Sequence, residues 1–206
     1  MNLKMHDKNN FIDKIRDNPG FYKLELGCGD RKLDDQSIGI DLIDSKNVDI
    51  VGNVFELLEI LPESCLSGIY SSHFIEHIDD LELFFELTSK VLVKGAELKT
   101  VAPHFSNSWF YSDPTHKNFF GLYTMCYFSD CSLFSRKVPT YSHVINFSLK
   151  SVFLEFKSSR PFYVRHALRK ILGFVINMSY YSMEFWEENL CNLISCYEVH
   201  YTLKKK

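Results

Sequence analysis

The sequence predicts an α/β fold with a mostly parallel sheet, and three observations support this prediction. The 206 residues are 46% hydrophobic and 24% charged, which suits one soluble globular domain with a sizeable core. An apolar strand at 22–26 ends in a glycine turn, and a second at 37–42 carries a carboxylate, Asp41, near its end. Apolar strands alternate with helical segments, which implies parallel pairing with right-handed crossovers.

The elements of this sheet follow in chain order. We expect a short helix at 11–16, ended by Asn18-Pro19-Gly20, and strands at 22–26, 37–42, 48–51, 67–72 and 97–102. The link at 27–36 is close to the lower limit of about 12 residues for a parallel crossover, so its helix has one or two turns at most.

One helix before the fifth strand has a clear apolar stripe. Its residues recur at three and four positions: Leu81, Phe84, Phe85, Thr88, Val91 and Leu92. Asp79 and Asp80 suit its start, and Lys94-Gly95 suits its end.

The pattern changes beyond residue 102. Residues 103–145 are rich in aromatic side chains with little periodicity, which predicts a substrate-side insertion or lid. Strands at 148–156 and 196–203 are expected to pair antiparallel at the C-terminal edge of the sheet. A helical insertion at 158–192 lies between them, with its clearest helix at 161–177. We expect residues 1–206 to form a single domain.

Composition excludes several classes of protein. A net charge of −3 gives no general attraction to nucleic acid, and no apolar run is long enough to cross a bilayer. The first ten residues are polar and predict no secretory signal, and the six cysteines lack metal-site spacing, so we expect reduced thiols and a cytoplasmic protein. Five basic residues form a local cluster: Lys157, Arg160, Arg165, Arg169 and Lys170. We expect this cluster to be mainly a solvated helix face, and the alternative is weak contact with a phosphate or an anionic surface.

The first two strand ends predict a nucleoside site. The carboxyl ends of neighbouring parallel strands meet at a ligand-binding crevice. Gly27 and Gly29 let the backbone approach a ligand, and Asp41 can accept hydrogen bonds from two neighbouring hydroxyls, as on a ribose. Lys32 occupies the third small position of a dinucleotide fingerprint and Asp41 comes too early for one, which argues against a nicotinamide oxidoreductase.

An ordered series of motifs resembles the class I S-adenosylmethionine-dependent methyltransferases over about residues 22–104. The series is Glu25-Leu26-Gly27-Cys28-Gly29, Gly39-Ile40-Asp41, residues 49–53, residues 71–77 and residues 92–98. Further on, Pro103-His104-Phe105 and residues 113–117 resemble a bacterial subgroup that accompanies polysaccharide and glycan biosynthesis. The resemblance implies a Rossmann-like methyltransferase fold, S-adenosylmethionine as cofactor and a small, sugar-like hydroxylated acceptor.

The resemblance also implies residue roles. Glu25, Gly27, Cys28 and Gly29 would face the methionine part of the cofactor. Asp41 and Leu42 would lie at the ribose, Asn53 and Val54 beside the adenine, and His73 near the sulfonium and amino group. Asn53 stands where many members have Asp, which alters the donor and acceptor sense toward the adenine.

Methyl transfer to a hydroxyl requires excluded water, an aligned acceptor and a proton acceptor. The candidate catalytic residues are His116, Asp113, His104 and His73. Histidine titrates near neutral pH, and Asp113 could orient an imidazole. The alternative is that residues 113–116 form a turn in which Asp113 bonds backbone amides.

His73, Glu76 and His77 form an H-x-x-E-H run with metal-ligand spacing on a helix. The same order occurs in some zinc hydrolases, and also in metal-free methyltransferases, so a divalent ion is not expected. If one binds, the candidate ligands are His73, Glu76, His77 and His116. The leading hypothesis is an O-methyltransferase. The alternatives are a non-catalytic S-adenosylmethionine-binding regulator and a metal-dependent hydrolase.

Overall fold

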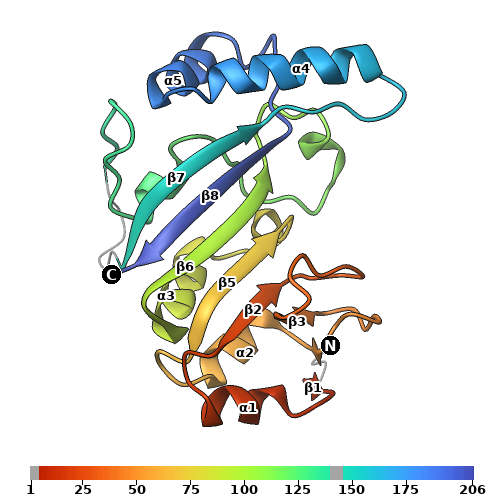
Figure 1. Cartoon of the computed structure of the whole chain (residues 1–206), viewed down its shortest axis with the longest axis vertical. Helices are drawn as coiled ribbons and strands as arrows, with labels where there is room; N and C mark the ends of the chain where they lie inside the picture. Colours follow the sequence, from red (N-terminus) through yellow and green to blue (C-terminus); the bar gives the residue numbers. More distant parts are fainter. Residues whose placement is uncertain (1–4, 140–145) are drawn as a thin grey trace.

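The computed structural model describes residues 5–139 and 146–206, and within them the chain forms one eight-stranded sheet (Figure 1). The strand order is β1-β4-β3-β2-β5-β6-β8-β7. The strands are β1 (His6–Asp7), β2 (Tyr22–Leu26), β3 (Ile38–Asp41), β4 (Ile50–Val51), β5 (Leu66–Ser72), β6 (Leu92–Pro103), β7 (Phe147–Glu155) and β8 (Glu198–Lys205).

Five α-helices and three 3-10 turns connect these strands. The helices are α1 (Phe11–Asp17), α2 (Val54–Ile60), α3 (Leu81–Val91), α4 (Tyr163–Ile176) and α5 (Tyr180–Asn189). The turns are η1 (Ile75–His77), η2 (Phe110–Ser112) and η3 (Thr124–Tyr127). None of the helices in the described ranges has the length and hydrophobicity of a membrane-spanning segment.

The centre of the sheet is parallel and its two sides are antiparallel. Strands β4, β3, β2, β5 and β6 pair in parallel, whereas β1 runs against β4 and β8 runs against both β6 and β7. This confirms the predicted α/β sheet and the antiparallel pair near the C-terminus. Because β8 lies between β6 and β7, β7 forms the outer edge.

The first crossover contains no helix, which corrects the prediction of one or two turns there. The carboxylate of Glu25 is almost fully buried and accepts hydrogen bonds from the Leu33 amide and the Ser37 hydroxyl, both at 3.1 Å. The ammonium of Lys32 also lies 2.9 Å from Asp49. These side-chain contacts hold the short link between β2 and β3 in place, and it needs no helical hydrogen bonds.

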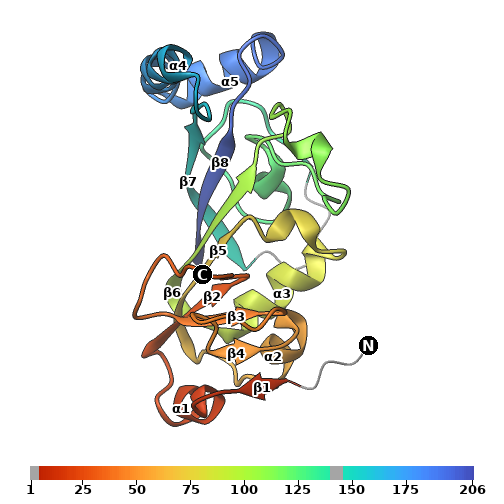
Figure 2. The ribbon, with the colours of Figure 1, turned by 90° about the vertical axis from the view of Figure 1, so that its right-hand side faces the viewer.

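The missing helix leaves one face of the sheet more open than the other. Helices α2 and α3 lie on the same face (Figure 2). On β6, Leu98 and Thr100 are buried while Glu97 and Lys99 are exposed. This alternation is typical of a sheet with one solvated face.

Other differences concern element ends and short elements. Helix α3 ends at Val91 and β6 begins at Leu92, so Lys94-Gly95 belongs to the strand and not to the helix end. Gly95 has φ +83° where the register between β5 and β6 shifts. Helix α2, strand β1 and the separate helix α5 were not predicted, because elements of two to ten residues with weak periodicity give little signal in the sequence.

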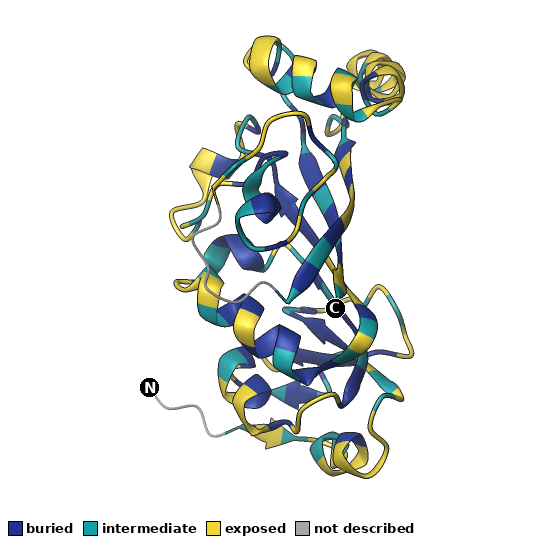
Figure 3. Cartoon of the chain, turned by 90° about the vertical axis from the view of Figure 1, so that its left-hand side faces the viewer, coloured by how far each residue is buried: buried dark blue, intermediate teal, exposed yellow. Residues whose placement is uncertain are grey.

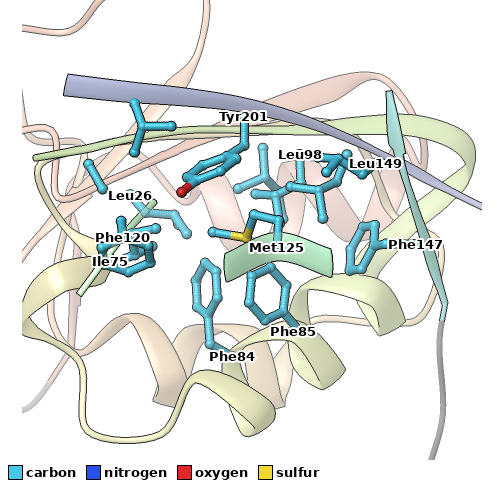
Figure 4. Packing of buried hydrophobic residues seen from close by; sticks show 14 of the residues in the cluster. Leu26, Ile75, Phe84, Phe85, Leu98, Phe120, Met125, Phe147, Leu149 and Tyr201 are labelled. Carbon is cyan, nitrogen blue, oxygen red and sulfur yellow. The ribbon is translucent and has the colours of Figure 1, made fainter. Parts of the chain in front are cut away.

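The core lies between the sheet and α3, and the aromatic segment after β6 contributes to it (Figure 4). Phe84 and Phe120 are fully buried in this cluster, together with Met125 from η3. The hydroxyl of Tyr201 on β8 donates to the carbonyl of Gly121 at 2.5 Å. One side of the segment 103–139 is therefore packed as core.

Helices α4 and α5 lie beyond the tips of β7 and β8, and much of α4 is exposed (Figure 3). In the basic cluster, Arg169 donates to the Lys157 carbonyl and Lys170 pairs with Glu155, whereas Arg165 is exposed. Helix α5 is fixed by Glu187, whose carboxylate bonds His104 Nε2 at 3.0 Å and the Leu122 amide at 2.8 Å. Glu187 therefore joins α5 to the end of β6 and to the aromatic segment.

We predict that Glu187→Ala lowers the free energy of unfolding by about 1–3 kcal/mol, because it removes the partner of the buried His104 Nε2 and of the Leu122 amide. Urea unfolding measures this change. Glu188→Ala, at an exposed neighbouring position, is the matched control and should stay within about 0.5 kcal/mol of the parent. Equal effects of the two substitutions would show that Glu187 does not fix α5.

Candidate active site

A cavity of about 680 Å³ lies at the carboxyl ends of β2, β3, β4 and β5, within the size range of small-molecule and cofactor sites. Its wall contains six of the predicted cofactor residues: Gly27, Asp41, Leu42, Asn53, Val54 and His73. The remaining wall residues are Ile43, Phe55, Phe74, His77, Ile78, Asp79, Asp80 and Leu83.

Asp41 is held in place by backbone amides. Its Oδ2 accepts from the Gly29 amide and its Oδ1 from the Ile43 amide, both at 2.9 Å. A carboxylate offers about four lone-pair positions, so each oxygen keeps one for a ligand hydroxyl. Leu42 and Ile43 follow as exposed apolar side chains on the cavity wall, where they offer a nonpolar surface beside the carboxylate.

Gly27 has a conformation and a neighbour that exclude a side chain. Its φ is +63°, a region that favours glycine. A Cβ atom at this position would lie 2.8 Å from the ring of Phe74. The backbone of the turn therefore forms the cavity wall directly.

Asn53 is the N-cap of α2, and its Oδ1 accepts from the Phe55 amide at 2.8 Å. Because the cap uses the oxygen, the Nδ2 group is the part of the side chain that remains to donate to a ligand. Val54 and Phe55 add apolar surface to the wall beside it.

Three predicted cofactor residues, Glu25, Cys28 and Gly29, do not line the cavity, although the Gly29 amide donates to Asp41 on its wall. Glu25 binds the link between β2 and β3 as described above. Cys28 is buried, and its sulfur would contact a Cβ placed on Gly39 at 2.6 Å. Burial, followed by the nearby Asp41, raises the pKa of the Cys28 thiol to about 12, so it stays protonated at neutral pH.

His73 stands at the end of β5 with φ 51°, an uncommon conformation that often occurs at functional sites. Its Nε2 lies 2.9 Å from Glu198 and its Nδ1 lies 3.3 Å from Glu76. The hydrogen bond to Glu198, together with the nearby carboxylate of Glu76, raises the pKa of His73 to about 9. The side chain is a cation at neutral pH, so it does not accept a proton there.

Glu198 on β8 was not expected from the sequence. Burial favours its neutral form, but hydrogen bonds from His200, His73 and Lys157 outweigh burial and hold the pKa of Glu198 well below its usual range. Lys157 lies 2.7 Å from the carboxylate. The only sequence signal was a charged residue at the start of an apolar strand.

His104 packs inside the protein. Its side chain is fully buried, with Nδ1 at 2.8 Å from Ser106 Oγ and Nε2 bound to Glu187. It does not line the cavity. His104 therefore joins β6 to α5 and has no contact with the cavity.

His116 and Asp113 lie in the segment that folds back onto η1. The amide of Lys117 donates to the Glu76 carbonyl at 2.7 Å, and its ammonium lies 2.6 Å from Asp79. His116 Nε2 is 3.7 Å from Asp113, and its ring lies 4.8 Å from that of His77 on the cavity wall. The structure thus places His116 against His77, although His116 itself is not a wall residue of the cavity.

Asp113 also forms the turn that was the alternative interpretation. Its Oδ1 accepts from the Thr115 hydroxyl and from the Thr115 amide, at 2.6 and 2.8 Å. These two bonds lower the pKa of Asp113. The contact of Asp113 with His116, at 3.7 Å, is therefore longer than its two hydrogen bonds within the turn.

Aromatic rings continue from His116 toward the surface. Phe110 is buried and lies 4.9 Å from the His116 ring and 4.8 Å from Phe119. Phe119 and Tyr111 are largely exposed. The segment therefore presents flat apolar faces next to the cavity.

Comparison with solved structures identifies the fold. An S-adenosylmethionine-dependent methyltransferase from Archaeoglobus fulgidus matches with a TM-score of 0.53 and 18% identity, over 96% of this chain and 94% of that one. Another from Mesorhizobium loti matches with a TM-score of 0.48 and 13% identity, over 94% and 96%. No protein-family model and no curated protein sequence matches the chain. The first likeness confirms the predicted Rossmann-like methyltransferase fold.

We predict that Glu198→Gln lowers stability at neutral pH. The depressed pKa of Glu198 gives the fold a stability that is fully present above the ordinary glutamate value of about 4.5 and is lost progressively as the pH falls from there through the much lower pKa of the folded state. The difference between the urea midpoints of variant and parent should therefore be largest at pH 7 and smaller at pH 3.5.

Glu86→Gln, at an exposed position on α3, is the control and should leave the midpoint unchanged at both pH values. A constant gap between Glu198→Gln and the parent at both pH values would contradict the assigned ion pairs.

Proposed function

We propose that this chain is an S-adenosylmethionine-dependent methyltransferase that transfers a methyl group to a hydroxyl of a small acceptor, such as a saccharide or glycan precursor. The observation that carries the proposal is the cavity at the strand ends, where Asp41 stands with free acceptor positions opposite the Gly27 turn. The methyltransferase fold supports the same assignment.

The wall residues fit the parts of this cofactor. Asp41 suits the two ribose hydroxyls, and Leu42 and Ile43 suit the apolar faces of the nucleoside. The Nδ2 of Asn53 suits a ring nitrogen of adenine, because a donor must meet an acceptor.

The acceptor side is formed by the segment after β6. The cofactor supplies a methyl group already activated on a sulfonium. The protein must exclude water and align the acceptor, and the exposed rings of Tyr111 and Phe119 offer surfaces for a ring-shaped acceptor. His116 Nε2 can take the proton of the hydroxyl, with the ring held by the bond from its Nδ1 to the Phe110 carbonyl, and Asp113, 3.7 Å from Nε2, stabilises the imidazolium that forms.

Calorimetric titration tests cofactor binding. We expect S-adenosylhomocysteine to bind and NAD not to bind. Asp41→Asn keeps the shape of the side chain but removes its charge, and hydrogen bonds to charged groups contribute about 1.5–3 kcal/mol. The variant should therefore bind S-adenosylhomocysteine roughly ten- to 150-fold more weakly.

Asp44→Asn, at an exposed position three residues further on, is the matched control and should bind like the parent. Binding of NAD in place of S-adenosylhomocysteine would refute the proposed cofactor.

A methyl-transfer assay with labelled S-adenosylmethionine and a panel of saccharides and nucleotide-sugars tests catalysis. His116→Asn should leave S-adenosylhomocysteine binding intact and lower turnover by roughly 10²–10⁴-fold, the usual contribution of a positioned proton acceptor. Cofactor binding without turnover on any hydroxylated acceptor would favour a regulatory binding protein instead.

A further inference from the structure

We propose that Glu76, His77 and His116 form a binding site for one divalent transition-metal ion at the acceptor side of the cavity. The ligand atoms of these three residues all lie within 4.8 Å of one another. His77 lines the cavity, and the ring of His116 lies 4.8 Å from that of His77. The site stands on its own geometry, and only its role in methyl transfer rests on the proposed function.

The carboxylate of Glu76 is the first reason for a cation here. Its side chain is fully buried, and neither carboxylate oxygen has a hydrogen-bond partner. His73 Nδ1 lies 3.3 Å from Oε1, within ion-pair distance but without hydrogen-bond geometry. A buried carboxylate normally accepts hydrogen bonds or binds a metal, and Glu76 has only its ion pair with His73, so its two oxygens have room for a further ligand.

The hydrogen bonds of His77 leave the correct nitrogen free. The hydroxyl of Thr115 donates its proton to Asp113 at 2.6 Å. The same hydroxyl oxygen lies 2.9 Å from His77 Nδ1, so Nδ1 must be the donor in that contact. In the neutral ring the lone pair is then on Nε2, which is available to a metal.

His116 has the same tautomer for an independent reason. Its Nδ1 lies 2.8 Å from the carbonyl oxygen of Phe110, which can only accept. Nδ1 therefore carries the proton, and Nε2 carries the lone pair. Metal-bound histidines commonly donate their other ring N–H to a carbonyl or to a group held by a carboxylate, as both rings do here.

His73 belongs to the wall of the cavity but not to this cluster. Its Nε2 is bound to Glu198, and the described cluster does not include it. This narrows the four candidate ligands from the sequence to three. The spacing H-x-x-E-H alone could not show which three residues form the cluster, because this depends on the contact of His73 with Glu198 and on the position of His116.

The ligand set indicates the kind of ion. Two imidazoles and one carboxylate suit Zn²⁺ or Fe²⁺ better than Mg²⁺. Bonds of about 2.1 Å in a tetrahedral site would bring the ligand atoms to roughly 3.4 Å from one another, so binding draws the three side chains together. Three protein ligands leave a position open for an oxygen of water or of the acceptor.

An ion in this site would lower the pKa of a bound hydroxyl. In the metal-loaded protein, His116 is then a ligand, and the ion takes over its role in activating the acceptor. From the sequence a metal was possible but not expected, because the same motif occurs without one. The buried Glu76 oxygens without hydrogen bonds and the two matching tautomers change that expectation.

The test is calorimetric titration of untagged, chelator-treated protein with Zn²⁺, together with absorption spectroscopy of the Co²⁺-loaded protein. We expect one Zn²⁺ per chain, and visible absorption bands of Co²⁺ that Zn²⁺ displaces. Glu76→Gln and His116→Asn should each weaken Zn²⁺ binding by tenfold or more. His6→Asn, at an exposed position on β1, is the matched control and should bind Zn²⁺ like the parent.

Absence of saturable Zn²⁺ binding and of Co²⁺ bands in the parent protein would overturn the site, as would binding that neither ligand substitution weakens. The Co²⁺ spectrum of the parent protein involves no substitution, so this part of the test holds even if a variant does not fold. Titration of the same samples with S-adenosylhomocysteine separates the two proposals. Nucleoside binding without metal binding removes only the metal site, and metal binding without nucleoside binding removes only the proposed cofactor.

Discussion

The site depends on one carboxylate that joins two strand ends. Asp41 is the last residue of β3, and its carboxylate accepts hydrogen bonds from the backbone amides of Gly29 and Ile43. These bonds hold the turn after β2 against the loop after β3. The parallel register aligns Leu26 with Ile40, so both loops begin at the same edge of the sheet. Since each carboxylate oxygen accepts only one hydrogen bond from the protein, the same group can hold the two loops together and still bind a ligand.

The opposite wall depends on charge compensation across the sheet. His73 at the end of β5 lies between Glu76 and Glu198, and Lys157 adds a second cation to Glu198. This arrangement keeps a cation on the cavity wall at neutral pH. It also separates the roles of neighbouring histidines, because His73 is occupied by carboxylates while the Nε2 atoms of His77 and His116 remain free.

Local patterns predicted the parallel strands and the position of Asp41, because these features depend on residues close together in the chain. The strand at 22–26 and the helix starting at Leu81 agree with the structure for this reason. The partner of His73 lies 125 residues away, and no local pattern connects them. The helix-free first crossover was missed because it depends on the buried contacts of Glu25 and not on helix propensity. The charge of His73 and the tautomers of His77 and His116 likewise depend on partners that only the folded chain brings together.

The place of β8 in the sheet has a consequence for biosynthesis. β8 pairs with β6 and β7, both of which precede it in the chain. From Glu155 to Glu198 the ribosome must add 43 residues, which takes roughly 2–9 s at about 5–20 residues per second. During that interval β7 has no strand beside it, and His73 lacks the carboxylate that Glu198 provides. The nascent chain therefore completes this wall of the cavity last, after the parallel half of the sheet has emerged.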